Sequence, residues 1–295
     1  MVRKRWRMKE TMLVPAQWSG SVEHFYHFFF GYFMPMVLWQ EKTSIKDFTI
    51  RDCGPMNPWF SLLQDGSRPT FIPPGVMLQR LLIHRQEMEI FRNWDNPLHF
   101  HKKSLELFST TILNRVGINS RAQNLAEKRI TVLDRKPSPE FFLAEKSEVL
   151  SSGAEWRSMP NTERIAESLQ HLGNVTLVDS AAMSPADQVR LFGQTDLLVA
   201  QHGAGLSNIV WLPKGAAVLE IKPPLPPVIN EIFANLASAR RIDYATVDQL
   251  DEHAEVDPNN VRIAVEFLLQ NPGTHVPTMS GRLPIRILRQ LPRRL

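Results

Sequence analysis

The sequence predicts an α/β fold whose second half carries a parallel sheet of Rossmann type. Short apolar, β-branched runs alternate there with segments whose apolar residues recur at helical spacing. This alternation is typical of a parallel sheet, because each helix carries the chain back across the sheet before the next strand begins. The predicted strands are Ile130–Leu133, Val175–Val178, Asp196–Ala200 and Ala217–Ile221, and the predicted helices are Thr162–Leu172, Ser184–Gly193, Leu206–Leu212 and Val261–Leu269.

The first half of the chain has weaker periodicity than the second. Glu23–Trp39 and Ser104–Arg115 have the spacing of helices, and Leu78–Ile83 has the composition of a strand. Asp52–Asp65 and Arg68–Gly75 contain glycine, proline and polar residues, which predict loops.

The length of 295 residues is enough for about two domains of ordinary size. We expect an acceptor-side lobe over residues 1–125 and a Rossmann-like, nucleotide-binding lobe over residues 126–270. Residues 271–295 form a basic tail that is free to pack back on the first lobe.

The composition is that of a soluble globular protein, with 43% hydrophobic and 22% charged residues. The formal net charge is +4, and the basic excess gathers at both ends. Basic ends of this kind are either solvated tails or segments that contact an anionic membrane surface or a nucleic acid. No DNA-recognition helix or aromatic RNA-binding motif is visible in the sequence, so a nucleic-acid partner is not expected. The basic residues are Arg3, Lys4, Arg5, Arg7, Lys9, Arg282, Arg286, Arg289, Arg293 and Arg294.

Cysteine content and hydropathy indicate a cytoplasmic location, with peripheral contact at the inner face of the membrane through the basic ends. Cys53 is the only cysteine, which excludes an intrachain disulfide and a cysteine-rich metal site. The first thirty residues lack a signal-peptide pattern, and Phe25–Trp39 is too short to span a bilayer. His99 and His101 put two imidazoles on one face of a predicted strand, but no third ligand is nearby, so no metal site is expected.

A glycine turn joins the third predicted strand of the second half to the helix that follows. Gly203 and Gly205 let backbone amides approach a ligand, and a helix N-terminus suits a phosphate. A dinucleotide fingerprint would need a third glycine where Asn208 stands, and a nucleophile elbow would need glycines flanking Ser207. A nucleotide or phosphate site and a tight turn without a ligand both remain open at this point.

Residues at the ends of other strands are expected to converge on the same site. Ligands of parallel sheets bind beyond the carboxyl ends of the strands. Arg135, Glu220 and His202 lie at or just after such ends, with Gly203 and Gly205. A leaving diphosphate needs its charge stabilised by a metal or by fixed cationic groups. The sequence has no D-x-D pair, which favours an arginine together with the helix N-terminus.

Four elements in fixed order resemble the carboxyl-terminal signature of glycosyltransferase family 61. They are Gln188–Phe192, Thr195–Val199, His202–Asn208 and Leu212–Glu220. Upstream, His24–Gly31 is similar to the histidine-plus-aromatic motif of that family, although the family often has an acidic residue where Gly31 stands. Arg135, Arg157 and Asn161 resemble conserved positions of the family between these regions, with a longer intervening loop in this chain.

The family includes plant xylosyl- and arabinosyltransferases and animal O-linked N-acetylglucosaminyltransferases. The resemblance implies a GT-B-like fold, with two Rossmann-type lobes and a donor site in the cleft. It also implies an inverting transfer of a sugar from a nucleotide-sugar, a UDP-sugar, to a hydroxyl group of a glycan acceptor. The lack of a D-x-D pair predicts that this transfer needs no metal, and no cofactor is expected. A non-catalytic homologue that binds the nucleotide-sugar is the alternative.

On this interpretation each candidate residue has an expected role. Arg135 and the backbone amides of the glycine turn hold the diphosphate, and Glu220 accepts hydrogen bonds from the ribose or is a surface carboxylate. His202 touches the phosphate or the donor sugar, or bonds a neighbouring backbone group. The remaining members are Gly203, Ala204, Gly205 and Leu206 in the turn, Arg157 and Asn161 beside the donor, and Gln188 and Asn208 as braces of the turn.

The expected catalytic base is His27, since an imidazole titrates near neutral pH. His24 lies one helical turn earlier and either shares this work or orients the base. A core histidine among aromatic residues is the alternative for His27.

Overall fold

The computed structural model describes residues 11–14, 23–72, 84–87, 100–118, 127–138, 140 and 153–273. The predicted strand Leu78–Ile83, His99, both clusters of basic residues and the tail from residue 274 onward lie outside these ranges. The chain forms two compact units. The first comprises Met1–Asn119, Ser138–Ser152 and Met183–Arg190, and the second comprises Ser120–Pro137, Gly153–Ala182 and Leu191–Leu295.

The first unit contains a four-stranded parallel sheet in the order β3-β2-β1-β4. The prediction of a loop over Arg68–Gly75 was wrong, because Arg68–Ile72 pairs along its whole length with its neighbour. It is an edge strand, and such a position tolerates the missing amide hydrogen of Pro69. The strands are β1 (Thr11–Val14), β2 (Asp47–Arg51), β3 (Arg68–Ile72) and β4 (His84–Glu87).

A long helical segment supplies the core of the first unit. It begins as α1 (Phe25–Phe28), passes through a π-helical turn (Phe29–Phe33) and continues as α2 (Met34–Thr43), so the predicted helix is confirmed and extended. The predicted loop after β2 contains a 3-10 helix, η2 (Gly54–Leu62). The aromatic side chains Phe28, Phe29, Tyr32, Phe33 and Phe108 are completely buried, and burial of each stabilises the unit by about 2 kcal/mol.

The predicted helix Ser104–Arg115 is confirmed as α3 (Lys102–Arg115). His101 occupies its N-cap position rather than a strand, and its Nδ1 accepts a hydrogen bond from the amide of Ser104 at 3.3 Å. This imidazole therefore satisfies one of the free amides at the start of the helix.

The second unit contains a five-stranded parallel sheet in the order β6-β5-β7-β8-β9. The four predicted strands are confirmed to within two residues, and the fifth strand, β9, was not predicted. This order is that of a doubly wound sheet. The strands are β5 (Arg129–Leu133), β6 (Asn174–Val178), β7 (Leu197–Gln201), β8 (Ala217–Lys222) and β9 (Asp243–Asp248).

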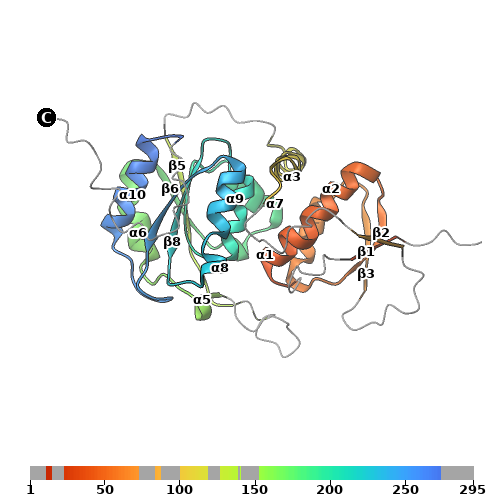
Figure 1. Ribbon diagram of the computed structural model, residues 1–295, viewed down its shortest axis with the longest axis horizontal. Coiled ribbons are helices and arrows are strands. Elements are labelled where there is room, and N and C mark those ends of the chain that lie inside the picture. The colour runs from red at the N-terminus through yellow and green to blue at the C-terminus, as the bar shows by residue number, and fades with distance from the viewer. Residues whose placement is uncertain are drawn as a thin grey trace, which may run out of the picture. The chain divides into compact units, whose positions relative to one another are not determined.

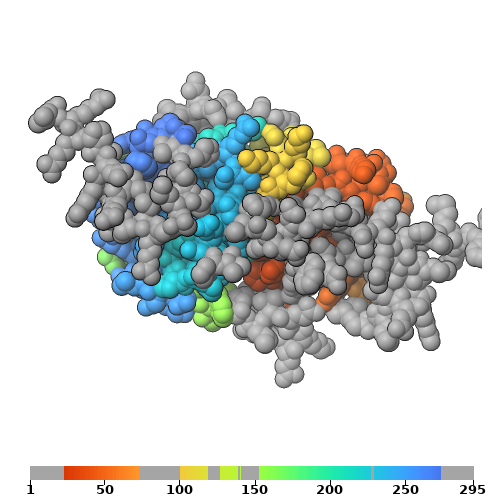
Figure 2. Space-filling model, in the orientation of Figure 1, coloured from red at the N-terminus to blue at the C-terminus, as the bar shows by residue number. Residues whose placement is uncertain are grey.

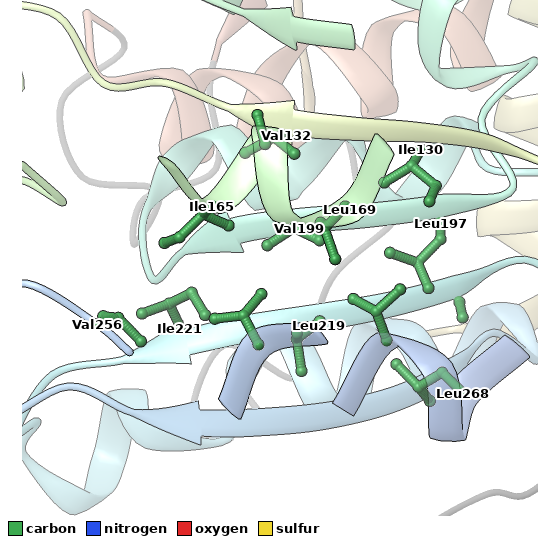
Figure 3. Packing of buried hydrophobic residues seen from close by; sticks show 14 of the residues in the cluster. Ile130, Val132, Ile165, Leu169, Leu197, Val199, Leu219, Ile221, Val256 and Leu268 are labelled. Carbon is green, nitrogen blue, oxygen red and sulfur yellow. The ribbon is translucent and has the colours of Figure 1, made fainter. Parts of the chain in front are cut away.

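Helices cover both faces of this sheet (Figure 1). On one face, α6 (Thr162–Leu169) and α10 (Pro258–Gln270) pack over a core of aliphatic side chains that includes Val132, Val199 and Leu219 (Figure 3). Atoms of α10, dark blue, are visible at the surface in Figure 2. On the other face, α9 (Ile232–Arg240) packs against β9 and against η7 (Ala204–Trp211).

The predicted helix Ser184–Gly193 is confirmed as α7 (Pro185–Phe192), with Val189 and Phe192 buried. The remaining elements are short: α5 (Gly153–Trp156), η5 (Gln170–Leu172), η6 (Ser180–Ala182) and α8 (Pro227–Asn230). The segment after the glycine turn, predicted as a helix over Leu206–Leu212, is the 3-10 helix η7 and begins two residues earlier.

Candidate anion-binding site

The carboxyl ends of β5 and β7 meet at the topological switch point of the second sheet. From β5 the chain leads to β6 on one side, and from β7 it leads to β8 on the other. Such a divergence leaves a crevice beyond the strand ends where ligands of doubly wound sheets bind. Arg135 follows β5 by two residues, and His202 follows β7 directly.

Arg135 lies against the glycine turn. Its Nη2 donates a hydrogen bond to the backbone carbonyl of His202 at 3.2 Å, which ties the segment after β5 to the segment after β7. Burial lowers the pKa of Arg135 to about 10, and the positive charge of Arg157 adds to this effect. The two guanidinium groups therefore lie close enough to repel each other.

Arg157 follows the short helix α5. Burial lowers its pKa as well, an effect that the carboxylate of Glu252 partly opposes. Its Nε is buried and has no hydrogen-bond partner among the described residues. The guanidinium carbon lies 5.6 Å from the ring centroid of Trp156, a residue that is 50% exposed.

Arg135 and Arg157, together called the arginine pair below, share one electrostatic property. Within the described ranges, no carboxylate forms an ion pair with either guanidinium. Two mutually repelling cations that form no ion pair within the protein are stabilised by a bound anion. The sequence singled out both residues, and the structure brings them together.

Residue 203 is a glycine because there is no space for a side chain, and not because the backbone conformation demands one. Its φ of 162° is extended and open to any residue. A Cβ atom at this position would lie 1.7 Å from Nη2 of Arg135, well inside the contact distance of the two atoms. Gly205 is less crowded, since its added Cβ would lie 3.2 Å from a methyl group of Leu133. The turn therefore makes room for an arginine of the chain itself.

The turn continues into η7, which is largely buried. Leu206 and Asn208 are completely inaccessible to solvent. The side-chain amide of Asn208 donates to the carbonyl of Gly205 at 3.0 Å, which closes the turn on itself. Gln188, expected as a second brace, belongs to the first unit, where its amide donates to the carbonyl of Met183 at 3.5 Å.

Glu220 is completely buried, so the alternative of a surface carboxylate was wrong. One carboxylate oxygen accepts a hydrogen bond from Nδ1 of His202, and the other accepts one from the hydroxyl of Tyr244. The ring of His202 packs edge-on against Phe233 of α9, with centroids 5.1 Å apart. A contact between Glu220 and a ribose stays a prediction, because both carboxylate oxygens already have partners within the chain.

Asn161 connects two loops at the same end of the sheet. Its side-chain amide donates to the carbonyl of Val256 at 2.7 Å, and its oxygen accepts from the amide of Val256 at 3.2 Å. Nearby, the amide nitrogens of Gln201 and Gln249 both donate to the carbonyl of Ser158, next to Arg157. These bonds hold the segment that carries Arg157 in place.

His27 lies on the helical segment of the first unit, and His24 is the N-cap residue at the start of that segment. Their ring centroids are 5.1 Å apart, and burial lowers the pKa of His27 below its ordinary value of 6.5. A π-helical turn, an irregularity that is frequent at functional sites, follows directly after Phe28. Burial thus favours the neutral form of the His27 imidazole.

Sequence reasoning missed Tyr244 and Gln201. Tyr244 lies on the unpredicted strand β9, and Gln201 is the last residue of β7. The β-branched and aromatic residues of Asp243–Asp248 were the available signal for β9. The backbone amides of Ala204 and Leu206 stay predicted phosphate ligands that no contact in the structure tests.

Within the described ranges, no three histidine, cysteine, aspartate or glutamate side chains group closely enough to hold a metal ion. Every helix in these ranges is too short or too polar to cross a membrane.

The fold and site define an α/β protein with a parallel, doubly wound sheet and paired arginines at the carboxyl edge of that sheet. The chain matches the model of the family glycosyltransferase 61 over residues 25–219, and it belongs to this family. The match spans the helical segment with His27 and ends within β8.

Characterised relatives of this family are similar to parts of the chain. The EGF domain-specific O-linked N-acetylglucosamine transferase of Mus musculus is 27% identical over 143 residues, which are 47% of this chain and 23% of the relative. The beta-1,2-xylosyltransferase XAX1 of Oryza sativa subsp. japonica is 40% identical over 76 residues, 25% of this chain and 13% of the relative. The alpha-1,3-arabinosyltransferase XAT3 of the same plant is 28% identical over 106 residues, 35% of this chain and 17% of the relative. The chain thus spans less than a quarter of the length of these relatives.

Proposed function

We propose that this protein is a glycosyltransferase that moves a sugar from a UDP-sugar donor to a hydroxyl group of a glycan acceptor. The observation that carries the proposal is the arginine pair at the switch point of the second sheet. The charge of Arg157 disfavours the charge of Arg135, and neither guanidinium forms an ion pair with a carboxylate of the described residues, so a bound diphosphate would neutralise both. Membership of the glycosyltransferase family supports a sugar diphosphate over other anions.

The proposed chemistry needs stabilisation of the leaving group. The acceptor oxygen forms a bond to the anomeric carbon while the bond from that carbon to the diphosphate oxygen breaks, and the electron pair leaves with UDP. Negative charge grows on the diphosphate, and preorganised guanidinium groups and backbone amides of the glycine turn stabilise it. We propose that these cationic groups take the place of a metal ion in this step.

The proton of the acceptor hydroxyl must be removed as the new bond forms. His27 is the proposed base, since burial lowers its pKa and so favours the neutral imidazole, the form that accepts a proton. Attack from the face opposite the leaving group gives inversion at the anomeric carbon. The GT-B-like arrangement of two lobes around the donor, and a cytoplasmic location, belong to this proposal and rest on the family resemblance and on the cysteine content.

The test has two stages. UDP titrated into the protein with a chelator present should give heat of binding at one site, and Arg135→Gln should weaken that binding. UDP-xylose, UDP-arabinose and UDP-N-acetylglucosamine are then offered as donors, and release of UDP is followed. Binding without release would favour the non-catalytic homologue, and the absence of UDP binding would overturn the proposal.

A further inference from the structure

Beside the glycine turn, hydrogen bonds link three polar side chains that come from three different elements. Tyr244 of β9 donates its hydroxyl hydrogen to Glu220 of β8, and the other oxygen of Glu220 accepts a hydrogen from Nδ1 of His202 after β7. The register of β8 and β9 pairs Val218 with Tyr244, so Tyr244 and Glu220 lie two positions apart on the same face.

We infer that Tyr244 and Glu220 are positioning residues that fix His202 with its hydrogen on Nδ1 and its Nε2 available to the donor. The inference deepens the proposed function, since it rests on a nucleotide-sugar bound at the arginine pair. It assigns a role to Tyr244, and it gives Glu220 the task of holding an imidazole in place of binding a ribose.

The direction of each hydrogen bond follows from the chemistry of the groups. A carboxylate only accepts, so the hydrogen shared with Glu220 belongs to Nδ1 of His202. Burial raises the pKa of Tyr244 well above its ordinary value, and the charge of Glu220 raises it further, so the phenol keeps its hydrogen and donates. A buried carboxylate with both oxygens bonded is anchored, whereas one with a missing partner would carry a desolvation cost.

His202 is placed to reach the same ligand as the arginine pair. Its backbone carbonyl accepts the hydrogen bond from Arg135, and its side chain retains 6% exposure. Among the described residues, no group forms a hydrogen bond with Nε2. Glu220 on β8 and the ring of Phe233 on α9 contact this imidazole. Tyr244 on β9 bonds Glu220, Arg135 after β5 bonds the backbone carbonyl of His202, and the charge of Glu231 acts on Tyr244.

The first test measures the tautomer of His202 without any ligand. Nitrogen NMR of the intact chain labelled with ¹⁵N-histidine is recorded at about pH 8, and the His202 signals are identified by their loss in His202→Gln. We expect a hydrogen-bearing Nδ1 and a bare Nε2. A hydrogen on Nε2 and none on Nδ1 would overturn the inference, whatever the protein binds.

The second test is a double-mutant cycle on UDP affinity, with Tyr244→Phe and His202→Gln made singly and together. Tyr244→Phe should weaken UDP binding about tenfold, the scale of a hydrogen bond to a charged group. In the His202→Gln background it should cause no further loss, because Tyr244 acts through His202. Additive losses would mean that Tyr244 only supports the fold, and would contradict the inference.

Controls separate this inference from the proposed function. Thr246→Val changes another hydroxyl of β9 and should leave UDP affinity unchanged. If the wild-type chain fails to bind UDP, the proposed function fails while the NMR result still decides the tautomer. If UDP binds and the losses are additive, the proposed function stands and the positioning role of Tyr244 is refuted.

Discussion

The guanidinium group of Arg135 occupies the volume that a side chain at residue 203 would need. An added Cβ at Gly203 would lie 1.7 Å from Nη2 of Arg135, and the same Nη2 donates to the carbonyl of His202 at 3.2 Å. The turn after β7 and the arginine after β5 therefore constrain each other, although 67 positions separate Arg135 from His202 along the chain.

Replacement of Gly203 by alanine should impair binding more than folding. The methyl group must displace the end of a flexible side chain, so we expect a small change in melting temperature and a loss of about tenfold or more in UDP affinity. Calorimetry and thermal unfolding measure the two effects. Gly205→Ala is the matched control, since its Cβ meets only a methyl group of Leu133 at 3.2 Å. Equal UDP affinity in both variants would refute this account of the turn.

The UDP affinity should fall as the pH rises through about 10. Burial and the neighbouring charge of Arg157 lower the pKa of Arg135 to about 10, and only the protonated guanidinium attracts the diphosphate. Below that pH the free protein already carries the charge, so the affinity should be flat between pH 8 and pH 9. Circular dichroism at each pH checks that the chain stays folded.

Replacement of Arg157 tests the electrostatic repulsion between Arg157 and Arg135. Arg157→Gln takes away one charge that lowers the pKa of Arg135, so the alkaline fall in affinity should move to higher pH while the affinity at pH 7 decreases. Arg164→Gln, at an exposed pair with Glu255, serves as the control and should change neither. An alkaline fall at the same pH in the Arg157 variant would rule out the proposed repulsion.

Transfer should depend on His27 in its neutral form. Because burial lowers its pKa, the acid-side fall in rate should have its midpoint below the ordinary imidazole value of 6.5. His27→Ala should reduce transfer by about a hundredfold or more with UDP affinity retained. His171→Ala, at a half-exposed position of η5, is the control. Wild-type turnover in the His27 variant would exclude this residue as the base.

Asn161 should matter for stability more than for the charge of the site. Asn161→Ala leaves the amide and carbonyl of Val256 without their partners, which should lower the free energy of unfolding by about 2 kcal/mol. Urea unfolding measures this value. Ser168→Ala, which removes a hydroxyl bonded to a carbonyl of its own helix, should cost less. An unchanged midpoint for the Asn161 variant would show that these two bonds are dispensable.

The sequence predicts the sheet of the second unit well because its central strands are buried on both faces. β7 consists of five buried residues, and such continuous apolar runs are visible without an alignment. β9 and α9 lack such a pattern and were not predicted. β9 is an edge strand of mostly half-buried residues, and α9 is buried on most sides, so its apolar residues show no clear helical period. In the first unit, Arg68 and Pro69 conceal the edge strand β3.

Some features of the candidate site could likewise be predicted from the sequence, and others could not. The end of a strand can be recognised locally, so Arg135, His202 and Gly203 could be assigned to one edge from the sequence. What fills the space at Gly203, and which side chains meet at Glu220, depends on the order and register of the strands. The contact between Tyr244 and Glu220 requires β9, and no spacing in the sequence specifies it.

Calorimetric titration of UDP into the intact wild-type chain and into the double variant Arg135→Gln with Arg157→Gln, with a chelator present, tests the central claim most directly. The arginine pair predicts binding of one UDP to the wild type and an affinity at least about a hundredfold lower in the double variant, since two charge-assisted contacts are lost. The absence of binding to the wild type, or equal affinity of the two proteins, would contradict the claim that these arginines hold the diphosphate of the donor.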